Sequence, residues 1–216
     1  QIYDVFYSNS SLYIVCPAEK PPVNIRQAGT NIDFYLRICP HGHTYVYHAA
    51  IEDCQETTLL INAERVDVEV NHYPCFENEI ILSTLVKHED NYLPQWIEYH
   101  KRLGIHRFVI YDNAHSTINT DGWKENEKEV CVSLTHDNIR ENNPSPTLTT
   151  TLQKYIQEGT VLVVQWPYPY VMQHSLNSAQ TTQQNHSLYA FRNSKYIGFL
   201  DVDEYINPQG YPSVDS

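Results

Sequence analysis

The distribution of apolar and polar residues changes near residue 75 of the chain. Before that point, short apolar or alternating runs are separated by prolines and glycines, a pattern typical of short strands joined by turns. Strands are expected at residues 11–15, 32–39, 44–49, 57–62 and 65–70. Their spacing predicts a small antiparallel β domain over residues 1–75, with its boundary at Pro74.

Residues 76–216 show a different pattern, in which apolar runs alternate with amphipathic segments. Strands are expected to start at Ile80, Arg107, Val161 and Tyr196, and helices are expected at 92–103, 148–156 and 176–193. A strand, a helix and a second strand within about 30 residues form a parallel pair through a right-handed crossover. We therefore predict an α/β domain with a mostly parallel, Rossmann-like sheet that contains all four strands.

The first of these helices has recognisable end signals. Asp90 and Asn91 supply the expected capping residue, and Pro94 suits the first turn. Gly104 is expected to end this helix in the left-handed conformation, and Gly159 is expected to close the next one.

Two carboxylates follow the last expected strand directly, because Asp201 and Asp203 are separated from each other by one residue. Ligands of open α/β sheets bind at the carboxyl ends of the strands. Repulsion between two neighbouring carboxylates favours a divalent cation held by oxygen atoms. On an extended backbone the two side chains would share one face. We therefore predict that Asp201 and Asp203 bind a metal ion.

Composition narrows the choice of partners. The chain of 216 residues has a formal charge of −12, which argues against nucleic acid because that partner requires basic patches. The charge is compatible with a metal site and with a neutral, sugar-like substrate. No apolar run approaches the length of a membrane-spanning helix, so a membrane is expected only through an anchor outside this segment.

The five cysteines leave two alternatives open. Four of them lie in the first 75 residues and Cys131 stands apart, without the C-x-x-C spacing of a metal site. They could form two disulfides in a secretory compartment, or they could all be reduced thiols.

Three separated blocks carry a resemblance to a known family. The first is LVKHEDNYLPQWIEYH at residues 85–100, and the second covers 103–105 with FVIYDN at 108–113. The third comprises Tyr189, Arg192 and the run FLDVDEY at 199–205. In this order, over roughly residues 79–210, they resemble glycosyltransferase family 92.

The resemblance implies a GT-A fold for residues 76–216 and an inverting transfer of a sugar, typically galactose. The donor would be a nucleotide-sugar such as UDP-galactose, and the acceptor a glycan or glycoprotein. Asp201 and Asp203 would line a Mn²⁺ (or Mg²⁺) site that grips the donor diphosphate. The donor nucleotide would contact Lys87, Glu89, Asp112 and Asn113.

Enzymes of this fold usually carry the acceptor site and the general base after the metal motif. We therefore expect the base beyond Ser216, and the chain to be a C-terminally truncated enzyme. In a eukaryote such an enzyme would be a membrane-anchored protein of the Golgi lumen; a cytoplasmic enzyme is the alternative. Asn185-His186 stands where the family often has Asn-Asp.

Other interpretations stay open for several of these features. Asp112 is also suited to a turn, Lys87 and Glu89 could be a surface pair, and Glu204 could support a metal or face solvent. For the whole chain, the alternative is a non-catalytic carbohydrate-binding protein. In that case the tyrosine-rich β domain would stack sugars, and the second domain would be a degenerate transferase.

Overall fold

The computed structural model describes residues 2–17, 22–38, 44–116, 124–126, 148–170 and 178–209. The chain forms two compact units. The first comprises Gln1–Cys75 and Gln184–Arg192, and the second comprises Phe76–Gln183 and Asn193–Ser216. Within the described ranges, no helix is long and apolar enough to span a membrane.

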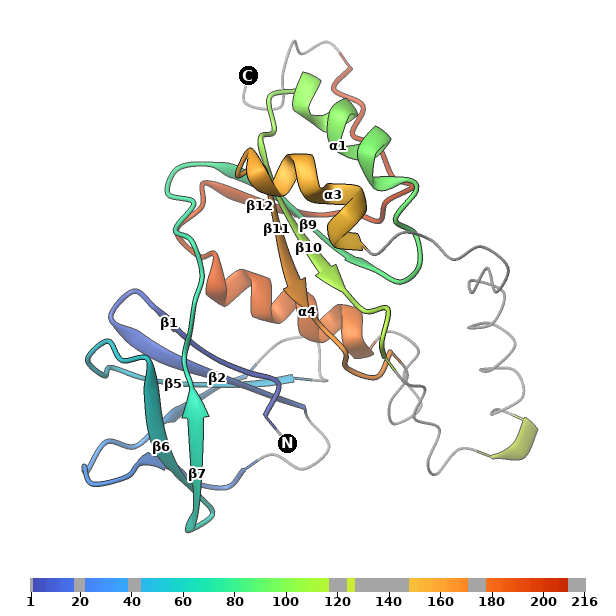
Figure 1. Ribbon diagram of the computed structural model, residues 1–216. Helices are drawn as coiled ribbons and strands as arrows, with labels where there is room; N and C mark the ends of the chain where they lie inside the picture. Colours follow the sequence, from blue (N-terminus) through green and yellow to red (C-terminus); the bar gives the residue numbers. More distant parts are fainter. Residues whose placement is uncertain are drawn as a thin grey trace. The chain divides into compact units, whose positions relative to one another are not determined.

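The first unit contains two sheets (Figure 1). One has the strand order β4-β5-β2-β1-β8 and the other has the order β3-β6-β7. Among the described residues, the strands of this unit pair antiparallel, except that β1 pairs parallel with β8. The strands are β1 (Asp4–Ser8), β2 (Ser11–Pro17), β3 (Ile25–Gln27), β4 (Tyr35–Ile38), β5 (Thr44–Ala49), β6 (Glu56–Ile61), β7 (Glu64–Glu69) and β8 (Asn71–His72).

Alternation along the strands separates the two faces of the five-stranded sheet. Leu12 and Ile14 of β2 point to an apolar cluster that also contains Ile25 and Leu59 from the three-stranded sheet. Tyr13, between them in sequence, lies on the opposite face, where its ring contacts Tyr189 at a centroid distance of 5.7 Å. The residues Gln184–Arg192 are therefore part of the packing of this unit.

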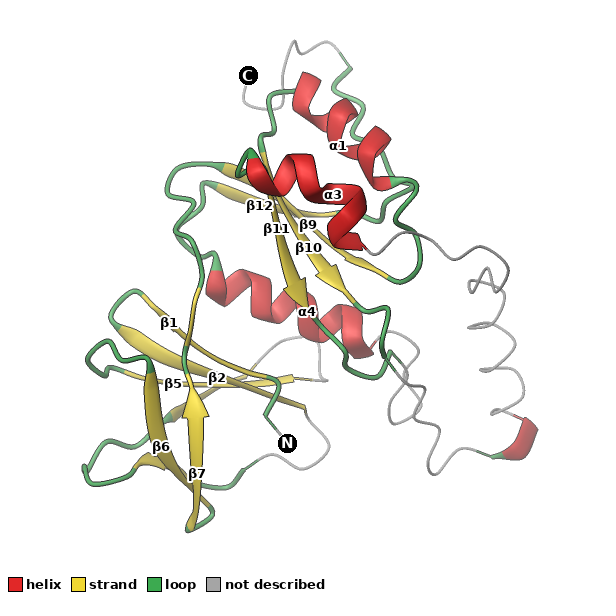
Figure 2. Ribbon diagram, in the orientation of Figure 1, coloured by secondary structure: helices red, strands yellow, loops and turns green. Residues whose placement is uncertain are grey.

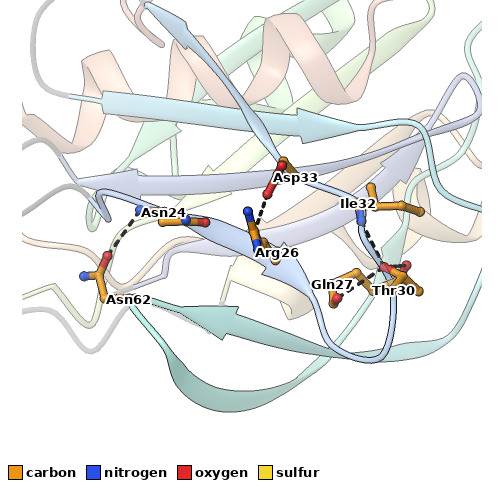
Figure 3. A network of polar contacts seen from close by, with 7 residues as sticks. All are labelled: Asn24, Arg26, Gln27, Thr30, Ile32, Asp33 and Asn62. Carbon is orange, nitrogen blue, oxygen red and sulfur yellow. Dashed lines mark hydrogen bonds and ion pairs between the residues drawn. The ribbon is translucent and has the colours of Figure 1, made fainter.

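A network of polar contacts lies where the expected strand 32–39 should begin (Figure 3). The Arg26 guanidinium donates to the carboxylate of Asp33, and the Ile32 amide donates to the Thr30 hydroxyl at 3.2 Å. Asp33 makes only an isolated bridge with Arg26. The strand that forms, β4, therefore begins at Tyr35 and is shorter than expected.

The second unit is a mixed α/β arrangement around one parallel sheet (Figure 2). Its strand order is β11-β10-β9-β12, and every neighbouring pair is parallel. The prediction that these four strands share one parallel sheet is confirmed. The elements are β9 (Ile80–Val86), α1 (Leu93–Arg102), β10 (Arg107–Asp112), α3 (Leu148–Gln157), β11 (Val161–Gln165), the first part of α4 (Ser178–Ala190) and β12 (Tyr196–Phe199). The residues of α4 from Gln184 onward belong to the first unit.

Both faces of this sheet are covered. The helices α1 and α3 pack on the face that presents Leu82 and Phe108, with Trp96 and Leu152 in the same apolar cluster. On the other face, the Gln183 amide near the middle of α4 donates to the Ser83 hydroxyl at 2.7 Å. Strands buried on both faces explain the nearly continuous apolar runs in the sequence.

The end of α1 follows the prediction, whereas its beginning does not. Gly104 has a φ of 92° and Gly159 a φ of 70°, so both adopt the expected left-handed conformation. Neither Asp90 nor Asn91 caps α1, because the N-cap residue is Tyr92 and no side chain bonds to the helix end. A turn precedes the helix, with the Tyr92 amide bonded to the Glu89 carbonyl, and it places Asp90 inside the turn.

Candidate functional site

One cavity lies at the carboxyl ends of the parallel strands β9 and β12. These strands are neighbours in register, so the residues that follow them lie at the same edge of the sheet. The cavity has a volume of about 200 Å³. It is lined by Leu85, Lys87, Glu89, Tyr170, Gln180, Asp201, Val202 and Asp203. Four of the six residues predicted from the sequence to bind metal or donor thus line one cavity.

The two aspartates lie on a turn and not on a strand, so the expected extended backbone at 201–203 is wrong. Pairing of β12 with β9 ends at Phe199, and the chain then turns, with the Glu204 amide donating to the Asp201 carbonyl at 3.0 Å. Val202 is buried and joins the apolar cluster under α1. The turn therefore fixes the central residue in the core and leaves Asp201 and Asp203 at the cavity.

Glu204 helps to close this turn. One oxygen of its carboxylate accepts a hydrogen bond from the Asp201 amide at 3.0 Å. The side chain of Asp201 in turn accepts a hydrogen bond from the Gln180 amide at 3.0 Å. The orientation of Asp201 is therefore set by neighbours on the turn and on α4.

The acidic groups of the cavity disfavour one another's charge. Burial raises the pKa of Glu89, and the carboxylates of Asp203 and Asp201 raise it further. Burial also raises the pKa of Asp201, as do Glu204 and Asp203, while the Gln180 amide opposes this. Since each repulsion is relieved by a positive charge, the cavity is electrostatically suited to a cation.

Lys87 is the one basic residue among those that line the cavity. Its ammonium group donates to the hydroxyl of Ser116 at 3.1 Å and to the carbonyl of the same residue at 3.3 Å. Burial lowers its pKa. The side chain thus spans from the end of β9 to the chain after β10.

The other two predicted nucleotide residues do not line this cavity. One oxygen of Asp112 accepts a hydrogen bond from the Ala114 amide at 3.0 Å, which is the turn geometry expected of an Asp-Asn pair. Asn113 is fully buried, and its amide donates to the carbonyls of Trp166 and Tyr168 at 2.6 and 2.9 Å. Asp112 lies at the same sheet edge as Val86, whereas Asn113 joins the ends of β10 and β11.

Two polar residues of the cavity, Tyr170 and Gln180, are absent from the sequence prediction. Burial raises the pKa of Tyr170, with further contributions from Asp201 and Glu89. Tyr170 follows β11, and a search for polar residues after every parallel strand would have included it. Gln180 lies on a glutamine-rich helix, and no sequence signal distinguishes it from Gln183 or Gln184.

The residues present fit a divalent metal only in part. Asp201 and Asp203 offer carboxylate oxygens, the ligands that Mn²⁺ and Mg²⁺ prefer. In the part of the chain that the structure describes, no three His, Cys, Asp or Glu side chains are grouped closely enough to hold a metal. A ligand that supplies further oxygens is therefore needed to complete the coordination.

The thiols of Cys16 and Cys54 are free, and burial raises the pKa of Cys16 to about 12. These two cysteines therefore follow the reduced-thiol alternative. Cys39 and Cys131 lie outside the described residues.

Comparison with known proteins supports the family resemblance. The profile of glycosyltransferase family 92 matches residues 135–214, a segment that contains both cavity aspartates and begins after the blocks at 85–113. A rice protein (Oryza sativa subsp. japonica) named as a glycosyltransferase family 92 protein is 24% identical over 139 residues. That alignment covers 64% of this chain and 18% of the rice protein. The resemblance inferred from the sequence is confirmed.

Proposed function

Because residues 135–214 match the profile of glycosyltransferase family 92, we propose that the chain is part of a metal-dependent glycosyltransferase with a GT-A fold. The observation that carries the proposal is the cavity itself. Asp201 and Asp203, inside the family match, share it with Lys87 and Glu89 at the carboxyl ends of parallel strands. Nucleotide ligands of open parallel sheets bind at this edge.

The proposed reaction is an inverting transfer of galactose from UDP-galactose to a glycan acceptor, in the Golgi lumen. A bound Mn²⁺ or Mg²⁺ would neutralise charge on the departing nucleotide diphosphate. Asp201 and Asp203 would hold the metal, and Gln180 would orient the first of them. Lys87 would place a positive charge beside the phosphates, and Asp112 would accept hydrogen bonds from the nucleoside.

The test is calorimetry of Mn²⁺ with and without UDP. Because two carboxylates fill only part of an octahedral site, Mn²⁺ alone should bind weakly, and UDP should tighten its binding by completing the coordination. The substitution Asp203→Asn retains the shape of the side chain and removes one charge, so it should abolish that tightening. Asp67→Asn, at an exposed position on β7, is the matched control.

Equal affinity for UDP in chelator and in Mn²⁺ would overturn the metal-bridged donor site. It would favour the alternative of a carbohydrate-binding protein with a degenerate transferase domain. Transfer itself is tested on a longer chain that extends beyond Ser216, by release of nucleotide from a panel of nucleotide-sugars.

A further inference from the structure

Three side chains on one face of α1 hold the chain just after the cavity turn. The Trp96 indole donates to the Glu204 carbonyl at 2.9 Å, and the Tyr99 hydroxyl donates to the Ile206 carbonyl at 2.7 Å. The third, His100, accepts through Nε2 from the Ile206 amide at 3.3 Å. Spacings of three and four residues place all three on one face of the helix.

The hydrogen bonds of His100 define its protonation state. Its Nδ1 lies 2.9 Å from the Trp96 carbonyl, which can only accept, so Nδ1 carries the proton. Nε2 is then free of hydrogen and accepts from the Ile206 amide. This requires the neutral ring, in agreement with burial, which lowers the pKa of His100.

Ring contacts reinforce the same connection. Tyr205 stacks on His100 with a centroid separation of 5.8 Å and an interplanar angle of 11°. Its ring also meets the edge of Tyr99 at 4.9 Å. Every residue from Glu204 to Ile206 is thus attached to α1, although this segment belongs to no strand or helix.

The attached segment begins one residue after Asp203. Its first residue, Glu204, also bonds to the Asp201 amide. Since a site with two carboxylates binds metal well only if both are held in place, the supporting contacts bear directly on affinity. We propose that Trp96, Tyr99 and His100 are positioning residues for the Asp201–Asp203 turn, an inference that rests on the proposed function.

The competing explanation is that these side chains only pack against the segment. A variant of Trp96 cannot distinguish packing from positioning, because the Trp96 ring is also part of the core. Variants of Tyr99 and His100 can distinguish them. Tyr99→Phe keeps the ring and removes only the donor to Ile206. His100→Leu removes the acceptor, whereas His100→Gln retains an acceptor at a similar reach and should rescue the defect.

The experiment measures Mn²⁺ affinity in the presence of UDP on the 216-residue chain and its variants. Tyr99→Phe and His100→Leu should each weaken Mn²⁺ binding by about 10-fold, the lower end for loss of supporting contacts in metal sites. His100→Gln should bind nearly as the parent does. Tyr155→Phe on α3 is the control, since the Tyr155 hydroxyl bonds to Glu98 of α1.

A second measurement reports on the geometry directly. Nitrogen-15 spectra of the histidine rings should show His100 protonated at Nδ1, and exchange of the Ile206 amide should accelerate in His100→Leu. Parent-like Mn²⁺ affinity in both Tyr99→Phe and His100→Leu would overturn the positioning role and leave the proposed function standing. Absence of UDP-dependent Mn²⁺ binding in the parent protein would overturn both the positioning role and the proposed function.

Discussion

At the scale of single residues, the contacts that hold the chain after the cavity turn include a neutral histidine, His100. His100 is fully buried, and the groups that contact it are the Trp96 carbonyl, the Ile206 amide and the rings of Trp96, Tyr99 and Tyr205. Burial is the cause that lowers its pKa, and the bond to the Trp96 carbonyl opposes it. The neutral ring is therefore favoured by the fold.

This gives a prediction on the pH dependence of stability. The unfolded chain takes up a proton on His100 near the ordinary pKa of 6.5, whereas the folded chain does so only at a lower pH. Between these two values the unfolded state binds more protons, so stability falls as the pH falls. The free energy of unfolding should therefore drop more steeply below pH 6.5 in the parent than in His100→Gln.

Urea unfolding of both proteins from about pH 5 to about pH 8 is the measurement, since this range covers the titration of histidine. Other groups titrate equally in the two chains, so the difference between the curves isolates His100. Parallel curves would show that the ring is not held neutral.

The site residues that the sequence revealed are those with a local signal. Asp201 and Asp203 follow one apolar run directly, and Lys87 and Glu89 follow another. Since residues that follow parallel strands lie at the same edge of the sheet, the sequence predicts that these four lie near one another. Gln180 reaches the cavity through tertiary packing, which leaves no local pattern. The turn at 201–203 was also missed. The residue at which β12 stops pairing with β9 depends on the partner strand and not on the residues of the turn.

At the scale of elements, β12 approaches β9 closely at a glycine. A β-carbon added to Gly198 would lie 2.7 Å from a terminal methyl group of Leu82. Leu82 is buried in the cluster beneath α1, so this methyl group has little room to move. Close packing of β12 against β9 therefore depends on the absence of a side chain at Gly198. The strand β12 leads directly into the turn that carries Asp201 and Asp203.

We predict that Gly198→Ala destabilises the protein by about 1–3 kcal/mol, the range for overpacking of a filled core. Leu82→Val removes that methyl group. The double variant Gly198→Ala/Leu82→Val should therefore lose less free energy of unfolding than the two single variants lose in sum. Thermal or urea unfolding of the four proteins completes the cycle. Strict additivity would show that the two side chains do not meet.

Elements with strong periodic or apolar runs were predicted well, while weakly patterned ones were not. The strand at 44–49 was placed at its observed bounds, and the strand expected to start at Ile80 begins there. The strand β1 was missed because its sequence, DVFYS, is short and mixes polar with apolar residues. The cap of α1 was assigned to Asp90 and Asn91 from residue type alone, and residue type does not reveal the turn that precedes the helix.

At the scale of the whole molecule, residues distant in sequence complete the first unit. The carboxylate of Asp4 is buried and accepts hydrogen bonds from Asn71, Tyr73 and His186, each at 2.7 Å. Burial alone would raise its pKa, but the bonds and the charge of His186, with the bonds of Tyr73 and Asn71, hold the pKa below its ordinary value. His186 is thus a structural partner of β1.

The boundary between two domains at residue 75, which the sequence pattern indicated, stays a prediction. Composition changes at that point, but Gln184–Arg192 belongs to the first compact unit. Periodicity along the chain cannot reveal such a contribution, because it reports which face of a helix is apolar and not which sheet covers it.

This leads to a prediction for the separated parts. Residues 1–75 alone would leave the rings of Phe6 and Tyr13 without His186 and Tyr189, and Asp4 without His186. A buried carboxylate that has lost one of its three hydrogen-bond donors and an exposed aromatic face both disfavour the folded state. Residues 1–75 should therefore lack the dispersed NMR spectrum of a folded domain, and residues 76–216 added in trans should restore it.

Variants of the added part test whether Gln184–Arg192 is the cause. Phe191 is 2% exposed and contacts Tyr73, so Phe191→Ala should weaken the association by about 3 kcal/mol, or roughly 100-fold. Leu188, in the same segment Gln184–Arg192, is 46% exposed, so Leu188→Ala should associate as the parent does. A dispersed spectrum from residues 1–75 alone would contradict this account, because it would mean that the sheets of the first unit fold without the helix residues that complete them.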